Sequence, residues 1–247
     1  MARTGIVWPF FWTSLALLAS GCKGVDLSSV PLADELGFVE VKPVPKEIRT
    51  RYGPTSKDRL EDIRKQRNRA KHGSDKVKEE ISGNLAQQIR REPNAFLRQE
   101  IVRTLAECQT SVAADILRQG LNDESVDVQI QCCRGWGKWG GEESVDVLGQ
   151  VLQNKLATMD LKIAAIDALQ TIGNLESAPF LVPLLDKRED PALQYRSLKA
   201  LQKITGKSLA DDQEAWETYI AEERDAAAVL EAKSSERSAT PSLFWWR

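Results

Sequence analysis

The sequence predicts an all-α fold, a right-handed α-solenoid of about four helix pairs with a C-terminal capping helix. One observation is an apolar position that recurs between residues 74 and 206 at spacings of 31, 33 and 32 residues: Leu105, Trp136, Leu169 and Leu201. Apolar or small residues also recur at fixed offsets around it, and these offsets largely share one side of a 3.6-residue helix. A second ladder precedes the first: Leu85, Leu117, Leu148 and Leu181. A helix pair of this length cannot bury its apolar stripe alone, so the pairs must stack.

Composition excludes several classes of function. The chain has 247 residues, is 42% hydrophobic and 28% charged, and carries a formal net charge of -2. A dedicated nucleic-acid-binding domain is usually clearly basic, so no nucleic-acid partner is expected. With a single histidine, His72, and four cysteines, the chain cannot build a His-rich metal centre. We expect no metal and no cofactor, and His72 is expected to close a helix, with Gly73 in the left-handed position after it.

Residues 1–21 are expected to form a lipoprotein signal peptide. Arg3 precedes an apolar run that is too short and too interrupted to span a membrane. The run ends in Leu18-Ala19-Ser20-Gly21-Cys22, which resembles the bacterial lipoprotein signal and implies lipidation at Cys22. The alternative is an ordinary secretory signal followed by a cysteine that has no such role. Lys23 follows where an Asp would resemble an inner-membrane retention signal, which favours the periplasmic face of the outer membrane.

Residues 22–54 are rich in Pro and Gly and are expected to form a flexible tether. Residues 55–73 are expected to form a basic helical arm that begins with a capping-box pattern at Thr55 and Asp58. The arm has only Leu60 and Ile63 as apolar anchors, so we expect it to be held weakly. Its positive charge either contacts an anionic lipid surface or simply solvates the helix.

Residues 74–206 form the expected solenoid. Their second helices contain Ala-Leu-Gln-Thr-Ile-Gly (168–173) and Ala-Leu-Gln-Lys-Ile-Thr-Gly (200–206) and resemble the HEAT-like repeats also seen in phycobilin lyases. A basic residue usual early in the second helix of this family stands at Arg98 and Lys162, whereas Gln129 and Gln194 replace it elsewhere. The resemblance specifies the fold and leaves the function open.

Residues 207–233 are expected to form an acidic capping helix, with Asp211 and Glu214 as its capping pattern and Trp216 covering the last repeat. This segment resembles the closing segment of bacterial HEAT-repeat lipoproteins. Residues 234–247 form a polar tail that ends in an aromatic motif: Phe244, Trp245 and Trp246. The motif could dock into the solenoid, enter a lipid headgroup region or bind another protein.

Five further residues of the repeats are expected to serve the core. Cys108, Cys132 and Cys133 lie on neighbouring second helices, too far apart along the axis for a disulfide, and are expected to be buried thiols. Trp136 and Trp139 occupy core registers, so a core role is favoured over a ligand platform. We expect Gly135 and Gly137 to make room for these rings and to weaken the second repeat.

Second helices line the concave side of such solenoids, and six cations there form the expected partner-binding ridge: Arg103, Arg134, Lys138, Arg196, Lys199 and Lys203. The ridge would suit an acidic or phosphate-bearing protein, although it could also be a merely soluble face. No catalytic residues are expected. The sequence thus favours a lipid-anchored, non-catalytic scaffold or adaptor for protein-protein interaction in the bacterial envelope. The alternative is a lyase-like or other enzyme that binds a small molecule on the concave face.

Overall fold

The computed structural model describes residues 53–239, and it describes side chains as far as residue 229. The predictions for the signal peptide, Cys22, the tether up to residue 52, and the tail motif of Phe244, Trp245 and Trp246 lie outside the described residues. None of the helices within 53–239 is both long enough and apolar enough to cross a membrane.

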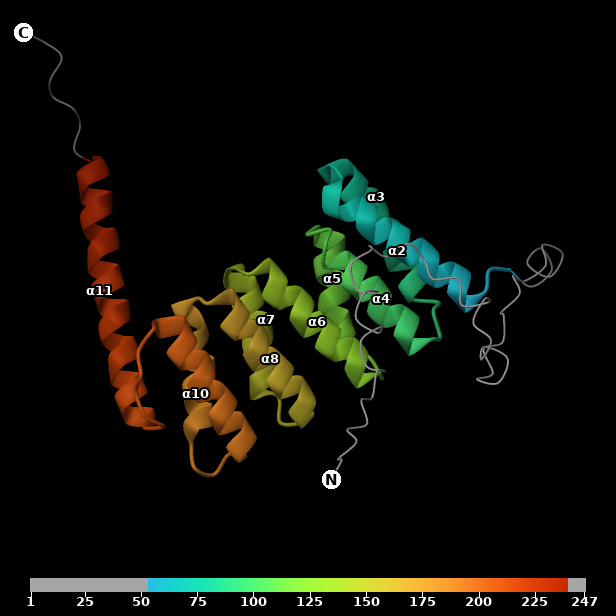
Figure 1. Ribbon diagram of the computed structural model, residues 1–247. Helices are drawn as coiled ribbons and strands as arrows, with labels where there is room; N and C mark the ends of the chain where they lie inside the picture. Colours follow the sequence, from blue (N-terminus) through green and yellow to red (C-terminus); the bar gives the residue numbers. More distant parts are fainter. Residues whose placement is uncertain (1–52, 240–247) are drawn as a thin grey trace, which may run out of the picture. The chain divides into compact units, whose positions relative to one another are not determined.

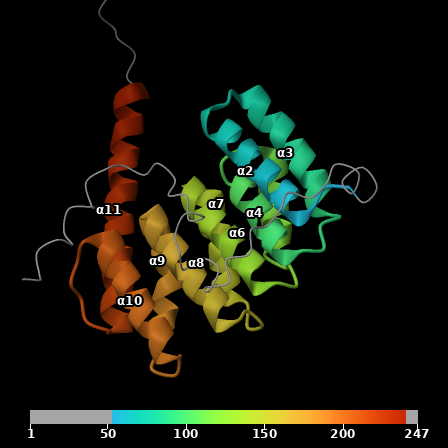
Figure 2. The same cartoon turned by 45° about the vertical axis from the view of Figure 1, so that its right-hand side comes forward.

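The described part of the chain is helical and contains no strand. Its elements are α2 (Ser56–His72), α3 (Asp75–Ile89), α4 (Ala95–Leu105), α5 (Ser111–Gly120), α6 (Val126–Trp139), α7 (Gly141–Gln153), α8 (Met159–Ile172), η2 (Leu175–Ser177), α9 (Ala178–Leu181), η3 (Val182–Leu185), α10 (Pro191–Thr205) and α11 (Gln213–Ala239). The second helices α4, α6, α8 and α10 pack against one another in chain order, and the first helices lie beside them (Figures 1 and 2). The predicted α-solenoid is confirmed.

Short polar residues and glycines set the limits of these helices. The side chains of Asn94, Thr110 and Thr158 accept hydrogen bonds from backbone amides of the first turns of α4, α5 and α8. Gly173 and Gly206 end α8 and α10 in the left-handed conformation, each with a φ of 69°.

The fourth first helix is irregular, which the ladder of leucines did not predict. Pro179 and Pro183 divide it into η2, α9 and η3. Proline has no amide hydrogen to donate and its ring clashes with the preceding turn, so a regular helix cannot run through both residues.

Helix α2 differs from the expected weakly held arm, because it packs against α4 as a further second helix. Its residues Ile63 and Ala70 are fully buried. The predicted capping box is present, with Thr55 and Asp58 bonding to each other's backbone amides. His72 is the last residue of α2, as expected.

Gly73, after His72, departs from the prediction, since its φ of -80° is extended rather than left-handed. A glycine is needed here because a side chain would not fit, and not because the backbone is left-handed. A Cβ there would lie 2.7 Å from the carbonyl oxygen of Arg69 and 2.8 Å from a methyl carbon of Val77.

Two buried carboxylates attach α2 to the rest of the solenoid. Glu92 pairs with Arg59 at 3.3 Å, and Glu100 pairs with Arg67 at 2.9 Å. In each pair the two residues are 33 residues apart, so both pairs join neighbouring repeats. Arg103 also pairs with Glu100, at 2.8 Å, which leaves the buried carboxylate held by two guanidinium groups.

Trp139 joins the two clusters into which the buried core divides. One cluster contains residues of α2 to α5, and the other continues from Val102 to Ile220. Trp139 packs against both, its indole nitrogen donates to the carbonyl of Ala106 at 2.8 Å, and its ring meets Trp136 edge-on at 5.2 Å. The core interpretation of both tryptophans is confirmed.

The three described cysteines are buried thiols, as the sequence indicated. Burial raises the pKa of Cys133 to about 12 and also raises the pKa of Cys132, because a thiolate would be poorly solvated in the core.

Helix α11 begins six residues after the start of the predicted capping segment and ends six residues beyond it, and Asp212 rather than Asp211 caps it. The Asp212 carboxylate accepts from the amide of Glu214 at 3.1 Å. Trp216 is fully buried with the last repeat, and its indole nitrogen donates to the carbonyl of Ala210 at 2.9 Å. From residue 221 to residue 229 every side chain is exposed, so only the first turns of α11 act as the cap.

Replacing Glu100 with Ala should destabilise the protein by about 2 to 3 kcal/mol, because Arg67 and Arg103 lose the carboxylate that neutralises them. The figure is below that for a fully buried pair, since both arginines keep contact with water. Urea unfolding followed by circular dichroism measures it. Lys65→Ala, which breaks an exposed pair with Glu61, is the matched control and should change stability by less than about 0.5 kcal/mol. Equal effects would contradict the role given to Glu100.

Alkaline pH should destabilise the protein through its buried thiols. The folded pKa of Cys133 is about 12 and its ordinary value is 9.0, so the thiol's contribution is complete below pH 9 and declines towards pH 12. The decline is about 1.4 kcal/mol per pH unit for one thiol. Urea midpoints between pH 8 and 10.5 should fall more steeply for the unchanged protein than for Cys133→Ala. Parallel curves would show that this thiol does not titrate on unfolding.

Candidate functional site

The exposed sides of α4, α6, α8 and α10 form one surface, named here the second-helix face. All six cations of the predicted ridge lie on these helices or immediately after them, but three of them are already paired. Arg103 pairs with Glu100, Lys138 with Glu107, and Arg196 with Asp167 at 3.3 Å. Each of these pairs neutralises a charge that the sequence had assigned to a partner.

The other three cations keep their charge for solvent or a ligand. Arg134 and Lys203 are exposed and form no ion pair within the described residues. Lys199 is also exposed, and its ammonium lies 5.7 Å from the ring centroid of Tyr195. The cationic ridge therefore consists of Arg134 on α6 and of Lys199 and Lys203 on α10.

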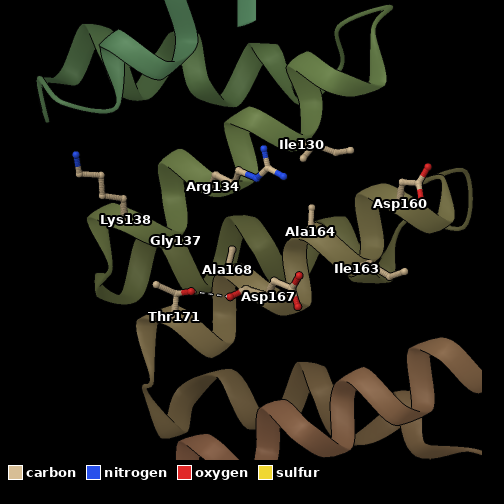
Figure 3. Close-up of a pocket in the computed structure, with 10 residues that line it drawn as sticks. All are labelled: Ile130, Arg134, Gly137, Lys138, Asp160, Ile163, Ala164, Asp167, Ala168 and Thr171. Carbon is tan, nitrogen blue, oxygen red and sulfur yellow. Dashed lines mark hydrogen bonds between the residues drawn. The ribbon is translucent and has the colours of Figure 1, made fainter. Parts of the chain in front are cut away.

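A cleft of about 650 Å³ opens on the second-helix face between α6 and α8 (Figure 3). Its lining residues are Ile130, Arg134, Gly137, Lys138, Asp160, Ile163, Ala164, Asp167, Ala168 and Thr171. In Figure 3, Asp160 lies towards one end of the cleft and Lys138 towards the other, with the small side chains of Ala164 and Ala168 between them. Arg134 and Asp167 are also drawn between these two ends, so charged side chains border the small residues along the cleft.

Gly137 sets how closely the two walls of the cleft approach. A Cβ at this position would lie 2.8 Å from the Cβ of Ala168 and 2.9 Å from its Cα. A Cβ at Gly135 would instead lie 3.0 Å from a methyl carbon of Leu117, on the opposite side of the helix. Both glycines make room for neighbouring helices, which corrects the expectation that they accommodate the tryptophan rings.

Polar contacts at the start of the second helices position the face. Arg98 forms ion pairs of 2.9 Å with Asp123 and Glu124 in the loop of the next repeat. Gln129 donates to the carbonyl of Asp123 at 2.6 Å, and Gln194 donates to the carbonyls of Asp186 and Glu189 at 2.9 Å. The glutamines therefore bond to the loop before their own helix. Arg98 does the same through the carbonyls of Glu92 and Pro93, and it also links two repeats.

The chemistry of the cleft suits binding. Asp167 is already engaged by Arg196, and the Thr171 hydroxyl donates to the Asp167 carbonyl at 2.8 Å. Across the described part of the chain, no group of three or more His, Cys, Asp and Glu side chains is placed to hold a metal ion. What the cleft offers is apolar contact beside charged side chains.

Sequence reasoning missed Ile130, Ile163 and Asp160, which line the cleft. The repeat register contained the signal, because Ile130 and Ile163 stand six residues before the recurring apolar position of their helices.

Replacing Gly137 with Ala should destabilise the protein, although alanine favours a helix by about 1 kcal/mol over glycine. The added Cβ collides with the backbone of Ala168, so α6 and α8 must separate. Gly83→Ala in α3 is the control, because nothing lies within 4 Å of its added Cβ, and it should stabilise by about 0.5 to 1 kcal/mol. Thermal unfolding compares the two. Stabilisation by both changes would show that α6 and α8 are not in tight contact.

Comparison with known proteins supports the repeat assignment. The family model for HEAT repeats matches residues 83–159. No curated protein matches the chain. A solved structure of an engineered protein from the Northeast Structural Genomics Consortium is similar at a TM-score of 0.40 and 18% identity, covering 64% of this chain and 78% of that one. The matched stretch runs from the second half of α3 to the start of α8.

Proposed function

We propose that this protein is a lipid-anchored, non-catalytic scaffold that binds another protein on its second-helix face in the bacterial envelope. The observation that carries the proposal is the open cleft between α6 and α8, next to cations that no carboxylate of the described residues neutralises. HEAT repeats generally mediate protein-protein interaction, and stacked repeats supply a rigid surface for it.

The proposed anchor is a lipid on Cys22. The residues before it match the small-residue pattern of bacterial lipoprotein signals, and each buried acyl CH₂ contributes about 0.8 kcal/mol of membrane affinity. Lys23 favours the periplasmic face of the outer membrane. Between this anchor and α2 lie some thirty residues rich in Pro and Gly. Anchoring confines the scaffold near the membrane and raises its effective concentration towards a partner there.

A second candidate function rests on the size of the cleft. A volume of about 650 Å³ lies within the usual range for small-molecule sites, so a lyase-like enzyme that binds a small molecule there is the alternative. Of the two acidic groups in the lining, Asp167 is engaged by Arg196 and Asp160 lies at the far end from Lys138, which favours the scaffold.

Replacing Cys22 with Ser should move the protein from the membrane fraction to the soluble fraction of the envelope, because the variant has no site for the acyl chains. Immunoblotting of fractionated cells measures the change. A Cys22→Ser protein that stays with the membrane would contradict lipid anchoring and leave a protein-mediated attachment to be identified.

The partner should be found by crosslinking the tagged full-length protein in its own cells, followed by mass spectrometry of the membrane fraction. Its recovery should fall at least about tenfold in the double variant Arg134→Glu, Lys199→Glu, since each reversal replaces attraction with repulsion. The matched control is Lys76→Glu with Lys155→Glu, two exposed lysines that lie away from the cationic ridge. Equal losses in both variants, or turnover of a small molecule without any protein partner, would contradict the scaffold.

A further inference from the structure

A row of apolar side chains crosses the second-helix face. It occupies one repeat position that lies outside the recurring core positions. Six residues before the recurring core position, successive second helices carry Gln99, Ile130, Ile163 and Tyr195. The last three are named here the apolar stripe. Ile130 and Ile163 are half-buried in the wall of the cleft, and Tyr195 is 60% exposed.

Two of the three stripe residues do not contribute to the buried core, unlike the recurring core residues of the same helices. Ile130 and Tyr195 belong to neither buried cluster and do not pack against one, although Ile163 does. The exposed ring of Tyr195 gains little for folding, yet it stands at the position that Ile130 and Ile163 hold on the other two helices. Apolar and aromatic side chains that reach the surface in one row, here two half-buried and one exposed, are typical of a protein-binding surface.

Charges of opposite sign border the stripe on its two sides. Three residues before Ile130 and Ile163 stand Asp127 and Asp160, both exposed and without an ion pair in the described part of the chain. Residues three or four apart on a helix lie on the same side, so these carboxylates flank the stripe towards the helix starts.

The opposite flank is basic. Four residues after Ile130 and Tyr195 stand Arg134 and Lys199, the free cations of the cleft and of α10. Asp167 holds the equivalent position on α8, and its ion pair with Arg196 offsets its charge. The surface is therefore acidic, then apolar, then basic from the start of these helices towards their ends.

The spacing of the stripe indicates what can lie along it. Packed helices are about 8 to 10 Å apart, so the three side chains form points at about that interval across α6, α8 and α10. A helix rises 1.5 Å per residue, and residues seven apart lie on one side of it at about 10.5 Å. A partner helix with apolar residues about seven positions apart therefore matches the stripe.

We infer that the stripe binds an amphipathic helix of another protein, laid across α6, α8 and α10. The acidic flank of that helix faces Arg134 and Lys199, and its basic flank faces Asp127 and Asp160. This inference rests on the proposed scaffold function and adds the chemistry and the direction of the partner. Complementary charge on both flanks permits one orientation and opposes the reverse one.

Photo-crosslinking in cells tests the inference. The photoreactive amino acid p-benzoylphenylalanine is placed at position 130, 163 or 195 of the full-length protein, one position at a time. The controls are position 112 on α5 and position 146 on α7, which are exposed on the first helices. All three stripe positions should crosslink to one segment of one protein, at sites six to eight residues apart in order, and the controls should not.

The sequence of the crosslinked segment gives a second criterion. It should carry apolar residues at the crosslinked spacing, with acidic residues on one helical flank. A synthetic peptide of that segment should bind the full-length protein at least about tenfold more weakly after Tyr195→Asp, with the circular dichroism spectrum unchanged, and equally well after Val112→Asp. Raised salt should also weaken the binding.

Other outcomes separate the inference from the proposed function. A reproducible partner that crosslinks only at positions outside the stripe, or through an extended or basic segment, overturns the inference and leaves the scaffold in place. Absence of any crosslinked protein at all positions overturns both.

Discussion

The stacking of second helix on second helix is the contact on which the rest of the structure depends. No helix pair can bury its apolar side alone, so each repeat is stable only against its neighbours. The contact is close where Gly137 meets Ala168, and the ion pairs of Arg98 link the loops of neighbouring repeats. Because stacking fixes the register between repeats, residues at one offset form a continuous row. The apolar stripe and the cationic ridge both arise in this way.

The same constraint explains how charged residues are used at the start of the solenoid. Glu92 and Glu100 are buried yet satisfied, because Arg59 and Arg67 reach them from α2. Those two arginines belong to the basic segment that was also a candidate for membrane contact. In the structure their guanidinium groups pair with buried carboxylates of the same protein. Helix α2 presents a charged outer side and an apolar inner side, which suits the end of a stack.

The proposed binding function depends on the cations of the second-helix face that form no ion pair within the described residues. Of six cations on the second-helix face, three are neutralised by carboxylates one turn away or one repeat away, and three remain for a ligand. Two of the free ones, Arg134 and Lys199, border a row of apolar side chains rather than forming a purely electrostatic patch. A surface of this kind distinguishes partners by shape and by the order of charges as well as by net charge.

The sequence by itself determined the repeat, the helix pairs and most of the core. Periodic apolar positions show which side of each helix must be buried against a neighbouring helix. It also determined the burial of Trp136 and Trp216 and the packing of Trp139 against the core. Only the tertiary structure decided that α2 joins the stack, because two buried ion pairs and few apolar residues hold it there. The pairing of Arg103, Lys138 and Arg196 and the cleft beside Gly137 likewise depend on distances between repeats, which no periodicity along one chain encodes.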